Sequence, residues 1–325
     1  MASSVGPIGD NAAAEENVVI CSGGCSVTLL PAFGGKISSI EVDGQELLQT
    51  PLNPYSARGP ETGFEESDAG GWDECVPTVA ACRVEYPDGE LHAPDHGDLW
   101  GIPWQVLESA ADSATLRARC TSLPLELTRS SILTETDSGW TLHLLYTLVN
   151  TGNARVPWLW SAHPLFAVDP GDRVILPEDV ASVRVEGSMD GKLRAGQQIL
   201  WPVAEQTDGS PRDLSVALDP EAKTGDKLFA GPLQDGWCVL DRRQSGLRLT
   251  MSFESAITPW LGLWLCYGGW PERPGAKQIC VAIEPTTAST DLLAAAGEST
   301  RWLSPGVSVT WPLELCIDRV TRETV

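Results

Sequence analysis

Basic residues are scarce in this sequence. Its 325 residues include 22 Lys and Arg against 44 Asp and Glu, which gives a formal net charge of −22. The acidic residues are spread along the chain, and the arginines form no cluster. Because binding to phosphate groups needs clustered basic side chains, this balance argues against nucleic acids and anionic membrane surfaces as partners. It is typical of a protein with neutral or cationic ligands.

Long apolar runs and paired cysteines are also missing. No apolar run reaches the roughly 18 residues that a membrane-spanning helix needs. The start, MASSVGPIGDNAAAEEN, has neither the basic nor the apolar segment of a secretory signal, so we expect residues 1–16 to form a flexible lead-in. The nine cysteines are odd in number and scattered, without a CxxC pair. This usage favours reduced, mostly buried thiols and a cytoplasmic location.

Helical periodicity is weak, and the dominant period is two. The segments LRLTMSFE (247–254) and VSVTWPLELCID (307–318) alternate apolar and polar residues, as half-buried strands do. The segment TLHLLYTLVN (141–150) is apolar at both phases, which predicts a central strand covered on both faces. Only ASTDLLAAAGEST (288–300) suggests a short helix or turn, while 31 Gly and 24 Pro mark many turns. We therefore predict one all-β domain over residues 17–325, a large antiparallel β-sandwich.

Histidine is rare, since the chain has only four. Two of them, His92 and His96, lie in LHAPDHGDLWGIPW (91–104), and His163 lies in WLWSAHPLFAV (158–168). Glu284 ends the apolar segment ICVAI (279–283), a position where a carboxylate lies at a sheet edge or cavity mouth and its pKa can be shifted. Each of these residues also has a structural interpretation: a solvated loop histidine, a hydrogen-bonded core histidine, or a carboxylate paired with an arginine.

Two kinds of chemistry are compatible with these residues. A metal site could use His92, Asp95, His96 and Asp98, but their spacing matches no zinc pattern and Pro94 breaks the loop, so we predict no metal. Acid/base chemistry needs an imidazole and a carboxylate in one concave site, which His96, His163 and Glu284 could supply. The 13 tryptophans add aromatic faces on which sugar C–H groups pack, although a large β core accounts for at least half of them.

Taken together, these segments resemble the aldose 1-epimerase (galactose mutarotase) family. HGDLWGIPW resembles the family's histidine-glycine segment, SAHPLFAV its HPYFNL-type segment, and VAIEP the strand with its catalytic glutamate. AFGGKISSIEVDGQELL resembles the N-terminal hairpin and YTLVNTGNARVPW a strand in the middle of the chain, so that the resemblance extends from about residue 17 to 318. It implies the galactose mutarotase-like (supersandwich) type of antiparallel β-sandwich.

The resemblance also implies a mechanism. Glu284 would be the base that takes the proton of the anomeric hydroxyl, and His163 the acid that protonates the ring oxygen. His96 would be the second histidine, which holds the ring oxygen and C1 region. Ring opening, rotation about C1–C2 and closure would then interconvert the α and β anomers of a sugar without a cofactor, in a monomer or homodimer.

The sequence departs from the family at the Asn-Arg segment that contacts sugar hydroxyls, where GGWDECVPTVAACR stands instead. Arg58 or Arg83 could replace the missing arginine. The predicted substrate-binding residues are Trp72, Asp73, Glu74, Arg83, His92, Trp100 and Trp160. The alternatives are a non-catalytic carbohydrate-binding protein, or a hexose-6-phosphate epimerase, lyase or hydrolase on the same fold.

Overall fold

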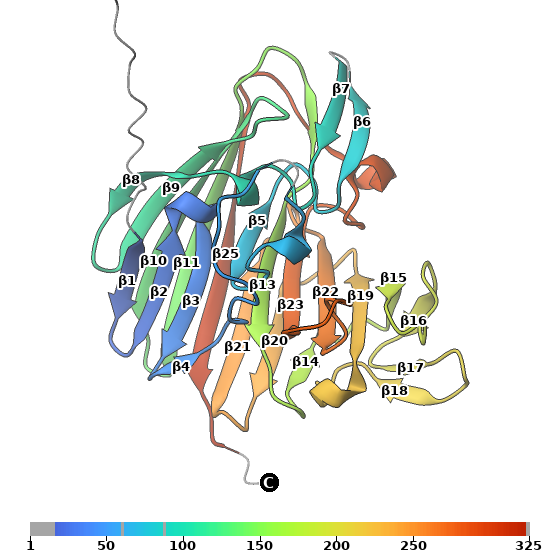
Figure 1. Cartoon of the computed structure of the whole chain (residues 1–325). Coiled ribbons are helices and arrows are strands. Elements are labelled where there is room, and N and C mark those ends of the chain that lie inside the picture. Colours follow the sequence, from blue (N-terminus) through green and yellow to red (C-terminus); the bar gives the residue numbers. More distant parts are fainter. Residues whose placement is uncertain (1–16, 60–61, 87–88, 323–325) are drawn as a thin grey trace, which may run out of the picture.

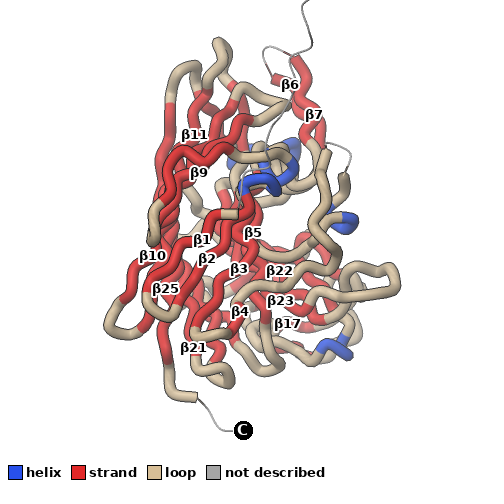
Figure 2. Tube along the Cα trace, turned by 60° about the vertical axis from the view of Figure 1, so that its left-hand side comes forward, coloured by secondary structure: helices blue, strands red, loops and turns tan. Residues whose placement is uncertain are grey.

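The computed structural model describes residues 17–59, 62–86 and 89–322, and the expected lead-in at residues 1–16 lies outside them. The described residues form two large antiparallel sheets, one of 11 strands and one of eight (Figure 1). Short 3-10 turns supply the helical segments in this part of the chain, and no helix there has the length and apolar character to span a membrane (Figure 2). The fold is thus the all-β sandwich predicted from the period of two.

The 11-stranded sheet holds the segments of greatest interest. In spatial order its strands are β1 (Val18–Ser22), β2 (Cys25–Leu30), β3 (Lys36–Val42), β5 (Trp72–Cys75), β13 (Ser161–Ala167), β23 (Ile279–Thr286), β22 (Trp260–Tyr267), β19 (Thr224–Ala230), β15 (Ser182–Ser188) and β16 (Gln198–Leu200), with β4 (Gln45–Glu46) beside β3. The predicted N-terminal hairpin is confirmed as β2, β3 and β4, joined through turns at Gly34–Gly35 and Asp43–Gly44.

The eight-stranded sheet closes the sandwich. Its strands are β14 (Arg173–Ile175), β20 (Trp237–Arg242), β21 (Leu247–Phe253), β25 (Ser308–Arg319), β11 (Gly139–Asn150), β10 (Leu125–Glu135), β9 (Ser113–Arg119) and β8 (Gln105–Ser109). Alternate residues of β21 and β25, such as Leu249 and Leu315, are buried against the first sheet, as predicted. β11 differs from its prediction because one of its faces is open to solvent, where Leu145 is 48% exposed.

Smaller elements complete the described structure. Two-stranded ladders join β6 (Cys82–Tyr86) to β7 (Gly89–Ala93), β12 (Val156–Trp158) to β24 (Arg301–Leu303), and β17 (Val203–Glu205) to β18 (Pro211–Asp213). The 3-10 turns span Pro31–Phe33, Phe64–Glu66, Leu99–Gly101, Pro220–Ala222, Leu293–Ala295 and Gly297–Ser299, the last two within the segment expected to form a short helix or turn. The β6–β7 hairpin projects beyond the sheets in both views (Figures 1 and 2).

The cysteines form no disulfides, in agreement with the sequence. All nine are free, and six of them are buried. Burial raises the pKa of the Cys75 and Cys120 thiols well above the usual value, which keeps them protonated and unreactive.

Candidate active site

The candidate site lies on the face of the 11-stranded sheet that points away from the second sheet. Successive residues of β23 alternate between these faces, because side chains on a strand have a period of two. Val281 and Ile283 join the core between the sheets, whereas Cys280 and Ala282 pack in a separate cluster on the other face, together with Phe64 and Trp100 from the loops above. Glu284 shares the phase of Ala282, so it points into the space beneath these loops.

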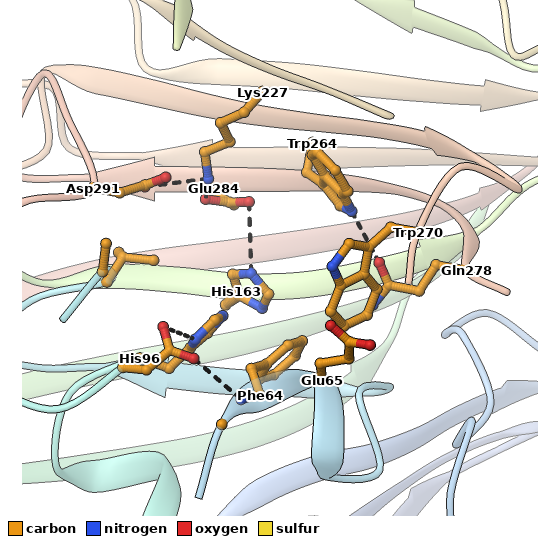
Figure 3. A pocket seen from close by; sticks show the side chains of 14 residues that line it. Phe64, Glu65, His96, His163, Lys227, Trp264, Trp270, Gln278, Glu284 and Asp291 are labelled. Atoms are coloured by element: carbon orange, nitrogen blue, oxygen red, sulfur yellow. Dashed lines mark hydrogen bonds and ion pairs between the residues drawn. The ribbon is translucent and has the colours of Figure 1, made fainter. Parts of the chain in front are cut away.

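A cavity of about 420 Å³ occupies this space (Figure 3). Strands of the sheet form its floor and loops form its walls. Its lining residues are Gly63, Phe64, Glu65, Val79, Ala80, Asp95, His96, His163, Lys227, Trp264, Trp270, Gln278, Glu284 and Asp291. The three residues predicted to carry acid/base chemistry, from segments far apart in the sequence, therefore line one cavity.

The strand register places His163 beside Glu284. β13 pairs with β23 so that Ser161 is opposite Thr286 and Leu165 is opposite Ala282, which sets His163 opposite Glu284. The Nε2 atom of His163 lies 3.8 Å from Oε1 of Glu284, and both side chains are buried. Oε1 accepts no hydrogen bond from the described residues, whereas Oε2 accepts one from the ammonium of Lys227. An unpaired carboxylate oxygen inside a cavity is available to a ligand.

His96 enters the cavity from a strained loop. It has a left-handed conformation with φ of 58°, which is uncommon for a residue with a side chain, and Gly97 follows with φ of 73°. A Cβ atom on Gly97 would lie 2.2 Å from the carbonyl oxygen of Val76, so the histidine needs a glycine after it. The ring of His96 stacks on Phe64 at a centroid distance of 3.9 Å and meets His163 edge-on at 4.9 Å.

Asp95 fixes this loop. Its Oδ1 lies 3.1 Å from Nδ1 of His96, and its Oδ2 accepts a hydrogen bond of 3.1 Å from the backbone N–H of Phe64. Burial alone would raise the pKa of Asp95, but its interaction with the adjacent His96 ring outweighs burial and lowers the pKa. Because Nδ1 of His96 faces Asp95, Nε2 is the ring nitrogen that can meet a ligand.

The electrostatics of the cavity follow from burial. Burial raises the pKa of Glu284 above its usual value, and the Lys227 charge opposes this without cancelling it. Burial also lowers the pKa of His163 well below its usual value, with further contributions from the charges of His96 and Lys227. For Lys227, burial favours a lower pKa, but the carboxylates of Asp291 and Glu284 outweigh it and raise the pKa. The cavity thus holds a stable cation beside a carboxylate with increased proton affinity.

The other end of the cavity is aromatic. Trp264 and Trp270 are half-buried there, and Phe64 lies 6.0 Å from Trp270 between ring centroids. Gln278 accepts a hydrogen bond from Nε1 of Trp264 at 2.9 Å and donates one to the carbonyl of Ala69. Figure 3 shows Trp270 and Gln278 on the opposite side of the cavity from Asp291. Apolar ring faces beside fixed polar groups are suited to a pyranose, which has both kinds of surface.

Three predicted sugar contacts are core residues instead. Trp72 is fully buried in the core between the sheets. Glu74 is also fully buried there and accepts hydrogen bonds from Arg129, Tyr146 and Trp160 at 2.9 to 3.0 Å. The prediction that Trp72, Glu74 and Trp160 contact substrate is therefore wrong, because the period of β5 turns Trp72 and Glu74 away from the cavity.

Asp73 lies on the cavity-side phase of β5, but its predicted contact with substrate is also corrected. Its carboxylate pairs with the buried Lys36 at 2.5 Å and lies 3.6 Å from the guanidinium of Arg58, and it does not line the cavity. The candidate arginine Arg58 pairs with Asp68 as well and stacks on Trp100 at 4.7 Å. Trp100 is buried behind His96 and donates to the carbonyl of Asp95, so it supports the histidine loop and lines a neighbouring cavity of about 250 Å³.

Arg83 and His92 face each other on the β6–β7 hairpin, where both are exposed. His92 lies 3.1 Å from Glu90, and neither Arg83 nor His92 lines the cavity. Contrary to the prediction that they contact the sugar, both residues lie on a projecting hairpin and not in the cavity.

The alternative metal ligands do not converge. His92 points to solvent, whereas Asp98 accepts hydrogen bonds from the backbone and side chains of Thr121 and Ser122. In the part of the chain that the structure describes, no three His, Cys, Asp or Glu residues are grouped as metal ligands.

Sequence reasoning missed several lining residues, namely Phe64, Glu65, Lys227, Trp264, Gln278 and Asp291. Lys227 and Trp264 are directly opposite each other in β19 and β22, so their place in the cavity depends on strand register. Phe64 and Asp291 lie in loops whose positions no local pattern specifies.

The comparisons with known proteins agree with this fold. We found no protein-family model and no curated protein that matches the sequence. Among solved structures, similar folds include a galactose mutarotase-like protein from Lactobacillus casei, with 18% identity, a TM-score of 0.66, and coverage of 93% of this chain and 100% of that one. The Slr1438 protein from Synechocystis has 17% identity, a TM-score of 0.70, and coverage of 97% and 100%.

A GalM/aldose epimerase homologue from C. elegans has 15% identity, a TM-score of 0.61, and coverage of 94% and 99%. At these identities the likeness is one of fold, and it extends over nearly the whole of each chain. The protein has the galactose mutarotase-like β-sandwich fold.

Proposed function

We propose that the protein is an aldose 1-epimerase-like isomerase, which interconverts the α and β anomers of a sugar by acid/base ring opening. The observation that carries this proposal is the convergence of His96, His163 and Glu284 in one cavity, with His163 Nε2 at 3.8 Å from Glu284 Oε1. General acid/base catalysis needs such groups within reach of one substrate.

In the proposed mechanism, Oε1 of Glu284 takes the proton of the anomeric hydroxyl. The C1–O5 bond breaks as its electron pair moves to the ring oxygen, which receives a proton from His163, and the free aldehyde forms. Rotation about C1–C2 and the reverse proton transfers then close the ring with the other configuration. His96, held by Asp95 and stacked on Phe64, hydrogen-bonds the sugar near C1 and the ring oxygen. No cofactor takes part.

The opposite pKa shifts of the two groups support these roles. A raised pKa makes Glu284 a stronger base, and a lowered pKa makes protonated His163 a stronger acid. Because the reaction runs in both directions through the same groups, Glu284 must also release its proton and His163 must take one back.

The charge of the lining favours a neutral sugar. Glu65, Asp95, Glu284 and Asp291 supply four carboxylates, whereas the lysine of the lining, Lys227, is paired with two of them. A phosphate would meet net negative charge without an unpaired cation among the lining residues. This argues for a free aldose over the hexose-6-phosphate of the alternative function.

Anomer exchange tests the proposal directly. We expect the protein to accelerate equilibration of freshly dissolved aldoses, measured by polarimetry and by saturation-transfer NMR. Glu284→Gln and His163→Asn should each lower the rate by roughly 100-fold or more, because each removes one proton-transfer group. The matched controls are Glu314→Gln and His143→Asn, which alter a similar exposed pair, 2.9 Å apart, on the outer face of the other sheet.

Two results would contradict the proposal. One is a wild-type protein that accelerates no aldose of a broad panel, and the other is a fully active Glu284→Gln variant. Sugar binding without exchange would instead support the non-catalytic carbohydrate-binding alternative.

A further inference from the structure

Lys227 reaches Glu284, the proposed base, from a strand two positions away in the sheet. β19 and β23 both pair with β22, on opposite sides, and Gly262 of β22 is directly opposite Glu284. The Lys227 side chain crosses β22 above this glycine. A Cβ atom at residue 262 would lie 3.0 Å from Oε2 of Glu284 and 3.5 Å from Nζ of Lys227. The glycine therefore leaves the space in which the two charged groups meet.

The ammonium of Lys227 joins two carboxylates. It donates a hydrogen bond to Oε2 of Glu284 and lies 3.2 Å from Oδ1 of Asp291 (Figure 3). The Lys227 side chain is 12% exposed and that of Asp291 is 19%, so this ion pair is largely shielded from water. Because Oε2 is held, the carboxylate of Glu284 presents Oε1 to His163 and the cavity.

Asp291 connects this pair to the histidine loop. Its carbonyl oxygen accepts hydrogen bonds from the N–H groups of Val79 and Ala80 at 3.0 and 2.9 Å. The carbonyl of Val79 in turn accepts one from the N–H of His96, at 2.5 Å. A continuous set of contacts thus runs from Glu284 through Lys227 and Asp291 to His96.

We infer that Lys227 is the positioning residue of the site, which orients Glu284 with Oε1 toward the substrate and, with Asp291, sets its proton affinity. Lys227 itself transfers no proton, because its raised pKa keeps it protonated. The catalytic meaning of this inference rests on the proposed function, whereas the orientation and charge balance of Glu284 do not depend on it.

The charges around Glu284 define the expected signs. The titratable groups near it are His163 from β13, His96 from the loop after β7, Lys227 from β19 and Asp291 from the loop after β23, together with the neutral thiols of Cys75 in β5 and Cys280 in β23. Lys227 lowers the pKa of Glu284 and Asp291 raises it. Lys227→Met should therefore raise the pKa, and Asp291→Asn should lower it.

A carbon-13 NMR titration of the Glu284 carboxyl measures both signs without substrate. The resonance is assigned by its loss in Glu284→Gln. In Lys227→Met we expect the titration midpoint to rise by about one to three pH units, the usual effect of losing an adjacent opposite charge. Lys227→Arg keeps the charge and should restore most of the wild-type midpoint, while Asp291→Asn should move it to lower pH.

Lys192→Met is the matched control, since it removes a lysine that pairs with Asp190 on the surface, and it should leave the midpoint unchanged. Anomer exchange supplies the second readout: Lys227→Met should lower kcat at pH 7 by about 10-fold or more, the equivalent of one pH unit, with a smaller change in KM.

The inference is overturned if Lys227→Met leaves the Glu284 midpoint in place, or if Lys227→Met and Asp291→Asn shift it in the same direction. If Lys227→Met does not fold, the same titration of Asp291→Asn and Lys227→Arg tests the inference. A wild type without anomer exchange but with these two opposite shifts would overturn the proposed function and leave the positioning role standing.

Discussion

Replacing Glu74 tests whether this residue belongs to the core or contacts the substrate. The sequence alone places Glu74 beside a sugar, whereas its carboxylate lies fully buried between the sheets and accepts hydrogen bonds from Arg129, Tyr146 and Trp160. Glu74→Gln leaves the buried guanidinium of Arg129 without a counter-charge. Breaking a buried ion pair from one side costs about 3–5 kcal/mol of unfolding free energy. For a chain of 325 residues that corresponds to a fall in Tm of roughly 4–7 °C.

The assay is thermal unfolding followed by circular dichroism, beside the KM for anomer exchange. We expect a lower Tm and an unchanged KM. Arg129→Met should also be destabilising, and the double variant should cost less than the sum of the two single variants, because after the first change the second charge is already unpaired. A raised KM at unchanged Tm would refute the assignment of Glu74 to the core.

Three further outcomes follow from the site. Because Glu284 must be ionised while His163 is protonated, and burial lowers the pKa of His163 well below 6.5, loss of the His163 proton should make kcat/KM for anomer exchange fall with rising pH; a rate profile that is level from pH 6.5 to 8.5 would contradict this. Gly97→Ala should abolish most exchange activity, since its Cβ atom would meet the Val76 carbonyl at 2.2 Å and displace His96, and a fully active variant would show that the loop does not position this ring. Hexose 6-phosphates should be exchanged at least about 10-fold less efficiently than the free hexoses in kcat/KM, as expected for a phosphate beside carboxylates, and an equal or higher value would reverse the charge argument.

The fold was predictable from the sequence because a period of two is a local signal. In β21 and β25, apolar and polar residues alternate, so the polarity of a residue predicts the face on which its side chain lies. In the structure, burial alternates in the same way along both strands. The same signal was ambiguous in β11. Leu145 and His143 there lie on an exposed outer face, and nothing in a local run of apolar residues distinguishes covered leucines from exposed ones.

The candidate site was predictable only in part. His96, His163 and Glu284 occur in short segments with a recognisable order, but their convergence depends on long-range strand register. Trp72 and Glu74 share one phase of β5 and Asp73 has the other, so a strand cannot present all three side chains to one cavity. Only Asp73 has the cavity-side phase, and its charge is already balanced by Lys36.

Two buried glutamates show why polarity alone does not assign charged residues to a site in a β-sandwich. Glu74 and Glu284 are both fully buried glutamates that end up beside a cation, one between the sheets and one in the cavity. All of the hydrogen-bonding partners of Glu74 come from the core, and both of its oxygens are occupied. Glu284 has one oxygen held by Lys227 and one left without a donor among the described residues. An incompletely paired carboxylate costs stability, so its presence at the bottom of a cavity is best explained by a ligand that completes it.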